Sequence, residues 1–184
     1  MDDAFLIRQV LGGNRNAFHL LVVRYQRPIF RFLGGMGLEA AAVEELAQEA
    51  FLRAFRSLGS YHAGKGTFSA WLFTIARNLA LNEIARSRRR APHVAWQEGV
   101  LGGDAGEPDP SAQEALETAE RRRRIHRAMG RLPELLRGVL VLAYMKELSI
   151  EDIAAVERCS VGTVKSRLFR GKKLLREALV QSED

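Results

Sequence analysis

Two short apolar runs separated by one turn, near the end of the chain, constrain its fold more than any other feature. Ser149 precedes the first run, and Asp152 follows three positions later. The side-chain oxygen of Ser149 can accept a hydrogen bond from a free backbone amide at the start of a helix, and the negative charge of Asp152 complements the helix dipole there. Apolar residues recur at helical spacing from Ile150 to Val156, and a second periodic run starts at Val161. We therefore expect a helix that starts at Ser149, a turn at 158–160 and a second helix.

The second of these helices is strongly basic on its exposed side. Residues 161–177 carry six Lys or Arg side chains against one acid, Glu177, with short polar residues between them. Cations attract phosphate, and short polar side chains approach base edges in a major groove. The pattern is that of a helix-turn-helix with a basic recognition helix, although an ordinary solvated helix remains the alternative. The candidate DNA-binding residues are Ser160, Thr163, Lys165, Ser166, Arg167, Phe169, Arg170 and Lys173.

The turn between the two helices has an unusual residue. Many helix-turn-helix units place Gly where a positive φ is needed, whereas this chain has Arg158 there. We expect a strained or differently shaped turn. The neighbouring Cys159 is the only cysteine, which excludes an internal disulfide and a cysteine metal cluster, and we interpret it as a packing residue.

Charge and composition indicate a folded protein with two basic regions. The 184 residues are 47% hydrophobic, without an apolar run near the ~18 residues that span a bilayer, and the acidic start lacks a signal-peptide pattern. We therefore expect a cytoplasmic protein with no direct membrane insertion. The net charge of +6 is uneven, because residues 92–117 carry six acids and no base. The segments on either side of residues 92–117 are both basic, so the chain can contact a polyanion such as DNA at two places.

Helical periodicity and breakers divide the chain into two all-α domains. We expect N-terminal helices over 2–11, from about 16 to 33 with a kink at Pro28, over 39–58 and over 67–90. Gly, Pro and acidic residues dominate the segment 93–117, which we expect to be a flexible linker. The predicted fold is all-α, with small helical domains at 1–92 and 118–184, the second containing the helix-turn-helix.

The fourth expected helix has an unusual polar face. Arg77, Asn78, Asn82 and Arg86 recur about one turn apart, and amides, guanidinium groups and nearby aromatic rings suit a single strand with unstacked bases. In the alternative interpretation, Trp71 and Phe68 are core residues and the arginines are a solvated helix end.

The sequence contains no pattern that indicates catalysis. It has no glycine-rich phosphate cradle, and His19, His62, His93 and His126 are too widely separated to form a metal-binding motif. No serine lies in a nucleophile-elbow setting. We expect a binding protein without an active site, metal or cofactor.

Three segments resemble the extracytoplasmic-function group of the bacterial sigma factor family. VEELAQEAFLRAFRSL is similar to the helix that docks on the clamp coiled-coil of the largest polymerase subunit. FSAWLFTIARNLALNEIARSRRR is similar to the helix that melts and reads the minus-ten element. LPELLRGVLVLAYMKELSIEDIAAVERCSVGTVKSRLFRGKKLLRE resembles the domain that reads the minus-thirty-five element.

The resemblance implies partners and residue roles. The expected partners are core RNA polymerase, through its clamp and the flap of the second-largest subunit, promoter DNA, and an anti-sigma factor anchored to the inner membrane. The candidate polymerase-binding residues are Leu46, Gln48, Glu49, Phe51 and Arg53. The candidate minus-ten residues are Tyr61, Lys65, Phe68, Trp71, Arg77, Asn78, Asn82 and Arg86.

Two other classes of function remain open. A stand-alone helix-turn-helix regulator would bind palindromic DNA as a dimer, although no dimerisation helix is evident. A nucleic-acid enzyme would need a metal or nucleophile constellation that the sequence does not display.

Overall fold

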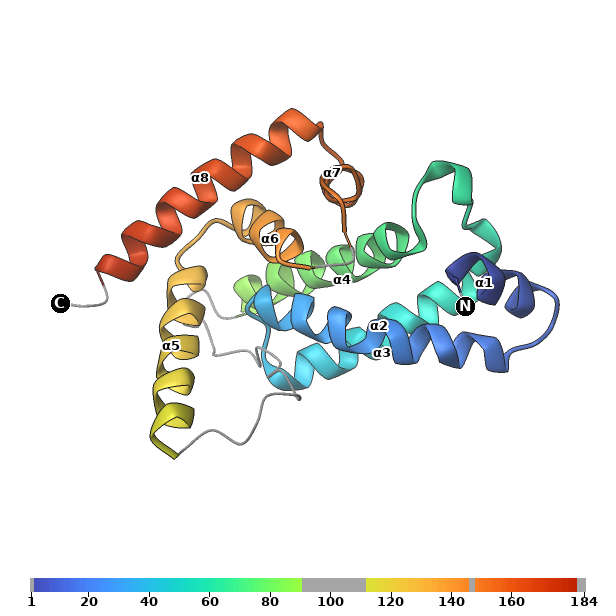
Figure 1. Ribbon diagram of the computed structural model, residues 1–184, viewed down its shortest axis with the longest axis horizontal. Coiled ribbons are helices and arrows are strands. Elements are labelled where there is room, and N and C mark those ends of the chain that lie inside the picture. Colours follow the sequence, from blue (N-terminus) through green and yellow to red (C-terminus); the bar gives the residue numbers. More distant parts are fainter. Residues whose placement is uncertain (1, 91–111, 146–147, 182–184) are drawn as a thin grey trace.

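The computed structural model describes residues 2–90, 112–145 and 148–181, and their regular structure is entirely helical (Figure 1). This confirms the predicted all-α class. Most of the expected linker, with His93, lies outside the described residues, and α5 begins within its last part, at Ala112. The elements are α1 (Asp3–Leu11), α2 (Asn16–Gly35), α3 (Ala40–Arg56), the 3-10 helices η1 (Leu58–Ser60) and η2 (Ala63–Lys65), α4 (Phe68–Arg90), α5 (Ala112–Gly130), α6 (Glu134–Ala143), α7 (Ile150–Glu157) and α8 (Val161–Val180).

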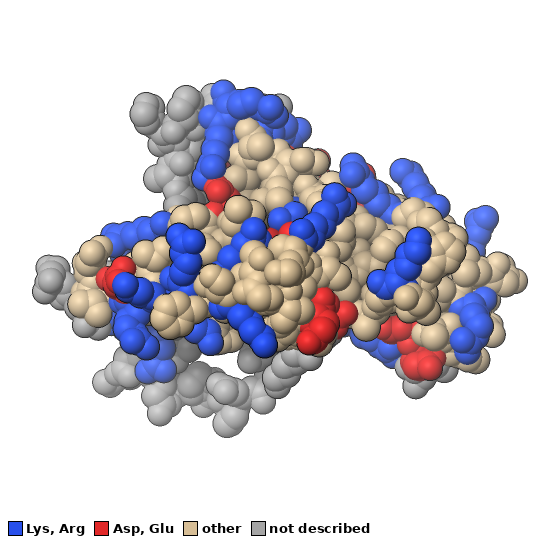
Figure 2. Space-filling view, turned by 90° about the horizontal axis from the view of Figure 1, so that it is seen from above, with Lys and Arg blue, Asp and Glu red and all other residues tan. Residues whose placement is uncertain are grey.

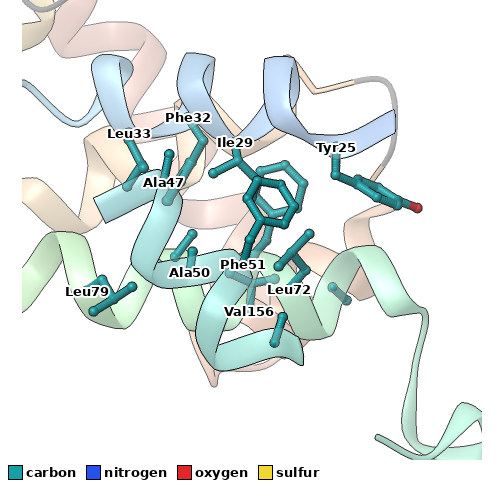
Figure 3. Close-up of a cluster of buried hydrophobic side chains, with 14 of the residues drawn as sticks. Tyr25, Ile29, Phe32, Leu33, Ala47, Ala50, Phe51, Leu72, Leu79 and Val156 are labelled. Atoms are coloured by element: carbon teal, nitrogen blue, oxygen red, sulfur yellow. The ribbon is translucent and has the colours of Figure 1, made fainter. Parts of the chain in front are cut away.

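Helices α2, α3 and α4 pack against one another, and α1 lies on α2. Each contributes an apolar stripe to a common core, which Figure 3 shows in close-up. Phe32 of α2 and Phe73 of α4 meet edge to face, with ring centroids 5.6 Å apart, an arrangement that aromatic pairs prefer. Alanines at 47, 50 and 54 bring α3 close to its neighbours. The stripes that the sequence predicted therefore form the core of the N-terminal domain.

Helix α2 runs through Pro28, as the continuing apolar stripe predicted, and ends at Gly35, two residues beyond the expected end. Ile29 and Phe32 are fully buried, and their packing offsets the hydrogen bond that proline removes. After Met36 the chain reverses at Gly37, where φ is 82°, a conformation that glycine adopts at little cost.

In the C-terminal domain α6 packs on both helices of the helix-turn-helix, and α5 packs on α8. Pro133 stands just before α6, as predicted for this helix start. Gly171 faces Leu140 so closely that a Cβ there would lie 3.0 Å from Leu140 Cδ1. Glycine at this position therefore fixes how near α8 can lie to α6.

The two domains are in contact, which the expectation of two domains on a tether did not include. Val156 of α7 lies in the same apolar cluster as residues of α2, α3 and α4 (Figure 3). Gly35 of α2 faces Val141 of α6, and a Cβ at Gly35 would lie 2.8 Å from Val141 Cγ1. One apolar core thus extends from the N-terminal domain into the C-terminal domain.

The side chain of Arg137 links the two domains through hydrogen bonds to backbone carbonyl oxygens. The buried guanidinium donates to the carbonyl of Met36 in the N-terminal domain at 2.8 Å, and to the carbonyls of Met129, Gly130 and Leu132 in its own domain. Burial lowers the pKa of Arg137 to about 10, so the group remains a cation near neutral pH. A charged donor of this kind satisfies carbonyls that helix ends leave without partners.

Candidate nucleic-acid interface

The helix-turn-helix begins with the cap that the sequence predicted. Ser149 accepts a hydrogen bond from the backbone amide of Asp152 at 3.0 Å, and the Asp152 carboxylate accepts one from the Ser149 amide at 3.1 Å. This reciprocal pair fixes where α7 starts. Burial acts to raise the pKa of Asp152, but hydrogen bonds from Thr67 and Ser149 outweigh it, and the pKa lies below its ordinary value.

The turn between α7 and α8 places an arginine in the left-handed region. Arg158 has φ 51° and ψ 47° and is the only non-glycine with a positive φ among the described residues. The sequence identified this position correctly as the one that needs a positive φ. A side chain with a Cβ costs about 1 to 2 kcal/mol in this conformation.

The exposed face of α8 carries most of the residues predicted to bind the minus-thirty-five element. Ser160 caps the helix by accepting from the Thr163 amide at 3.1 Å, and Val164, Gly171 and Ala178 form its buried side. Phe169 is 74% exposed and therefore lies on the outer face of the helix. The other exposed candidates are Ser160, Lys165, Ser166, Arg170 and Lys173. Figure 2 shows Lys and Arg spread over the face of the molecule on which α8 lies.

Two of the predicted DNA-binding residues on α8 are less exposed than the others. Thr163 is half-buried beside the Ser160 hydroxyl, at 2.9 Å, and so supports the cap. Arg167 is half-buried and donates to Glu157 Oε2 at 3.4 Å, while Cys159 lies 3.8 Å from the same guanidinium. Their contacts therefore lie largely within the domain.

The candidate minus-ten residues divide into an aromatic cluster and a polar helix face. Tyr61, Phe68 and Trp71 pack together, with ring centroids 5.6 to 5.7 Å apart. Phe68 is only 2% exposed and also meets Tyr25, so we correct its assignment from DNA contact to core residue. Trp71 and Tyr61 are half-buried, and Lys65 in η2 is exposed.

Tyr61 is held at the edge of the cluster by its hydroxyl, which donates to the carbonyl of Gly66 at 3.2 Å. Burial and, to a smaller extent, the negative charge of Asp3 raise the pKa of Tyr61. A phenol is protonated at neutral pH even at its ordinary pKa, and the raised pKa does not change this.

The residues on the polar face of α4 have different surroundings: one contacts the C-terminal domain, and others face solvent. Arg77 donates to both oxygens of Glu157 on α7, at 2.8 and 2.9 Å, and both side chains are largely buried. Asn78 is half-buried, whereas Asn82 and Arg86 are exposed, with Arg86 paired to Glu83 at 2.6 Å. No local sequence pattern indicated the Arg77–Glu157 contact, because the two residues belong to different domains.

A surface groove runs between α3 and α4. Its lining combines carboxylates, arginines and leucines, and comprises Glu45, Leu46, Gln48, Glu49, Leu52, Arg53, Leu79, Asn82, Glu83 and Arg86. Four of the five candidate polymerase-binding residues lie here, and Glu49 accepts from Arg53 Nε at 2.6 Å. The fifth, Phe51, turns inward and is 9% exposed, so we correct it to a core residue. Asn82 and Arg86, predicted to bind DNA, share this groove.

The described residues carry neither a bilayer-spanning helix nor a metal-binding cluster. In the parts of the chain that the structure places, no helix is both long and apolar enough to cross a membrane. Within the same residues, no three His, Cys, Asp or Glu side chains lie together as metal ligands.

Two family models match the chain, one in each domain. Sigma-70 region 2 matches residues 21–90, which include α3, α4 and the groove. Sigma-70 region 4 matches residues 122–175, which include the helix-turn-helix. Together the two matched segments cover more than half of the chain.

Curated relatives match along almost the whole length. The RNA polymerase sigma-H factor of Pseudomonas aeruginosa is 37% identical over 181 residues, covering 96% of this chain and 93% of that one. The ECF RNA polymerase sigma-E factor of Escherichia coli K12 is 34% identical over 179 residues, covering 95% and 93%.

Solved structures share the fold. CnrH in complex with the cytosolic domain of CnrY matches with a TM-score of 0.70 and 25% identity, covering 99% of each chain. The sigma factor RpoE of Bartonella quintana, bound to the anti-sigma factor NepR, matches with a TM-score of 0.68 and 25% identity, covering 88% of this chain and 96% of that one. Both domain models and the full-length relatives agree, and the chain belongs to the sigma-70 family, in the extracytoplasmic-function group of RNA polymerase sigma factors.

Proposed function

We propose that this sigma factor directs core RNA polymerase to promoters through two DNA-reading surfaces. Helix α8 would read the minus-thirty-five element, and α4 with the loop 61–68 would read the minus-ten element. The observation that carries the proposal is the outer face of α8. Its inner side is fixed by Val164 and Gly171, while Lys165, Phe169 and Arg170 are exposed together. A recognition helix needs this division, because base edges are read by side chains that do not hold the helix in place.

On α8 we assign different tasks to different side chains. Lys165, Ser166, Phe169 and Arg170 lie on the exposed face and are proposed to face base edges in the duplex. Lys173, one turn further along, is proposed to bind phosphate and set the register of the helix. Ser160 and Thr163 position the helix start through the cap that joins them.

At the minus-ten element we propose that unpaired bases meet the edge of the aromatic cluster. Trp71 and Tyr61 offer half-buried rings on which a base can stack, and Lys65 lies exposed in the adjoining loop. Asn78 and Asn82 supply amides that can hydrogen-bond to base edges, and Arg86 supplies a cation for the phosphates. Arg77 would reach a phosphate only in exchange for its ion pair with Glu157.

We propose that the groove between α3 and α4 binds the clamp of the largest polymerase subunit. Leu46 and Leu52 give it apolar surface, while Gln48, Glu49 and Arg53 give it polar groups with defined positions. A partner helix with an apolar stripe and polar flanks fits this mixture. The flap of the second-largest subunit is proposed to hold the C-terminal domain.

We further propose that an anti-sigma factor controls this chain. Two solved structures with the same fold contain CnrH with the cytosolic domain of CnrY, and RpoE with the anti-sigma factor NepR. For this chain we propose a partner of that class, anchored to the inner membrane, acting on domains divided at 1–92 and 118–184 by the segment 93–117. The protein itself is proposed to act in the cytoplasm as a non-catalytic specificity subunit.

Footprinting of reconstituted holoenzyme tests the proposal. Core polymerase with this chain should protect duplex DNA near minus thirty-five and make thymines near minus ten reactive to permanganate, whereas core alone should do neither. Arg170→Ala should weaken the upstream footprint, and Arg176→Ala, further along the same helix, is the control. Protection of a palindromic site by the chain alone, without polymerase, would support a stand-alone regulator instead.

A further inference from the structure

The outer face of α2 carries apolar side chains that face solvent. Leu20, Val23 and Phe30 are 46%, 51% and 38% exposed. They lie on the side of the helix away from its buried stripe, whose members Ile29 and Phe32 point toward α3 and α4 (Figure 3). The outer face of α2 is therefore apolar surface that the described core does not cover.

The exposed residues on this face repeat with the period of a coiled-coil seam. Leu20, Val23, Arg27 and Phe30 follow one another at intervals of three, four and three positions, which are successive a and d positions of two heptads. All four side chains are exposed. In a coiled coil, side chains at these positions pack against a neighbouring helix. The outer face of α2 thus has the pattern of one half of a helix–helix interface.

The same face is strongly basic. Residues 4–38 contain five arginines and no Asp, Glu or Lys. Arg27 lies within the apolar stripe, while Arg24 and Arg31 lie along one edge of it. Arg24 also pairs with Asp3 of α1, which shows that an acidic group can approach this edge. A partner that covers the stripe would need carboxylates to match the arginines.

The position of Arg27 favours a partner helix over a lipid surface. A helix that lies on a membrane keeps its cations beside its apolar sector, whereas Arg27 stands inside the stripe, between Val23 and Phe30. Lipid tails offer nothing to a guanidinium at that place. A partner helix can put a carboxylate opposite Arg27 and apolar side chains opposite its two neighbours.

Two other occupants fit the face less well. A nucleic acid would use the arginines for its phosphates but would leave the exposed leucine, valine and phenylalanine uncovered. A second copy of this chain would bring the arginines of one α2 against those of the other, and like charges repel. An acidic amphipathic helix is the occupant that satisfies both the apolar stripe and the charge.

The outer face of α2 is separate from the surfaces proposed above for polymerase and DNA. The described residues that line the groove belong to α3 and α4, and the recognition helix belongs to the C-terminal domain. An occupant of the outer face of α2 therefore needs none of the side chains assigned to those partners.

We infer that the outer face of α2 is a docking site for an acidic amphipathic helix of a partner protein. Apolar side chains of that helix cover the stripe, and its carboxylates form charge-assisted hydrogen bonds with the arginines. The inference goes beyond the proposed function and does not depend on it, since these contacts involve neither polymerase nor DNA.

Synthetic helical peptides and the full chain test this inference. The acidic probe has four heptads with Leu at a and d, Glu at e and g, and Ala or Gln elsewhere, and repulsion between its glutamates opposes self-pairing. The basic probe has Lys in place of every Glu. Fluorescence anisotropy of the labelled peptides measures their affinity for each variant of the chain.

Arg27→Glu should weaken binding of the acidic probe at least about ten-fold and strengthen binding of the basic probe, because one side chain changes from attraction to repulsion. Arg131→Glu is the matched control, since it makes the same change in net charge at an exposed site of the C-terminal domain. It should change neither affinity by more than about two-fold, because distant surface charges are largely screened.

Val23→Ser should weaken binding of the acidic probe at least about five-fold, because it removes apolar area that the probe would cover. Val180→Ser makes the same substitution at a 60% exposed valine of α8 and should leave the affinity unchanged. Valine and serine have similar helix propensities, so both variants should stay folded, and thermal melting checks this.

Several results would overturn the inference. One is an acidic probe that does not bind the unmodified chain, and another is an equal loss in Arg27→Glu and Arg131→Glu, which would mean that only net charge matters. A loss in Leu52→Ser, which alters the groove, without a loss in Val23→Ser would place the probe in the groove.

The other occupants are tested with the same variants. Phosphatidylglycerol vesicles or a thymidine oligonucleotide that bind the chain through Arg27, while the acidic probe does not bind, would assign the face to lipid or nucleic acid. A dimer in analytical ultracentrifugation that Val23→Ser dissociates would assign it to a second copy of the chain. Each of these results would contradict a site for an acidic partner helix.

Discussion

Arg77 and Glu157 form a two-pronged ion pair, at 2.8 and 2.9 Å, between helices of different domains. The pair is largely buried, with side-chain exposures of 11% and 1%. Removing one partner of a buried pair leaves an uncompensated charge, which is costly even when the pair itself contributes little. The pair therefore makes the stability of the folded chain sensitive to one carboxylate.

Glu157→Gln should lower the free energy of unfolding by about 2 to 4 kcal/mol, because two arginines lose their counter-charge in a buried setting. Urea denaturation followed by circular dichroism measures this change. Glu177→Gln, at an exposed site on α8, serves as the control and should change stability by less than about 0.5 kcal/mol. A Glu157→Gln loss as small as that of the control would contradict the role of the buried pair.

Asp152 should make stability depend on pH. Its pKa in the folded chain lies below the ordinary value of 3.8, so its contribution is complete above that value and is lost as the pH falls through the folded pKa. At pH 7, Asp152→Asn should cost about 1 to 2 kcal/mol, because the charged acceptor for Thr67 and Ser149 is gone. The difference in the free energy of unfolding between the unmodified chain and Asp152→Asn should shrink below pH 3.8.

Denaturation curves at several pH values test this expectation. Glu151→Gln, which alters an exposed acid in the same helical turn, is the control. A cost of Asp152→Asn that stays constant from pH 7 to pH 3 would show that the carboxylate charge is not what stabilises the helix start.

Arg158→Gly should stabilise the chain. The residue occupies the left-handed region at φ 51°, where glycine has no Cβ to strain, and the side chain is exposed. Glycine also gives the unfolded chain more conformational entropy, which offsets part of this benefit. We therefore expect the free energy of unfolding to rise by about 0.5 to 1 kcal/mol. Thermal unfolding measures it. Arg158→Ala removes the same side chain but keeps the Cβ, so an equal gain from alanine would argue against backbone strain.

Asn82 and Gln48 line the same groove but are proposed to bind different partners. Asn82→Ala should weaken open-complex formation by about 0.5 to 1.5 kcal/mol and leave polymerase affinity unchanged, because it loses only a hydrogen bond to an exposed base. Gln48→Ala should lower polymerase affinity. Permanganate reactivity and a polymerase-binding titration separate these effects. An Asn82→Ala variant that loses polymerase affinity would move this residue to the polymerase surface.

The sequence predicted local structure well because short-range chemistry decides it. Ser149 and Asp152 form their cap within one helical turn, Arg158 lies where the turn requires a positive φ, and α2 continues through Pro28. Each of these features depends on residues a few positions away, and propensity and periodicity describe that range.

Contacts between the domains could not be predicted in the same way. Gly35 and Val141 are distant in sequence, and nothing in either local pattern indicates that one faces the other. Phe51 and Phe68 show a different limit, because the family resemblance assigned both to binding surfaces and only the packing shows that both side chains are buried.

Run-off transcription from a pool of promoter fragments measures whether this chain directs core polymerase to particular promoters. Purified core polymerase with this chain should produce defined transcripts whose templates share two elements, and core polymerase alone should not. Arg170→Ala should change which upstream elements are enriched, because it alters a proposed base contact. An identical set of transcripts with and without the chain would contradict the claim that it gives polymerase its promoter specificity.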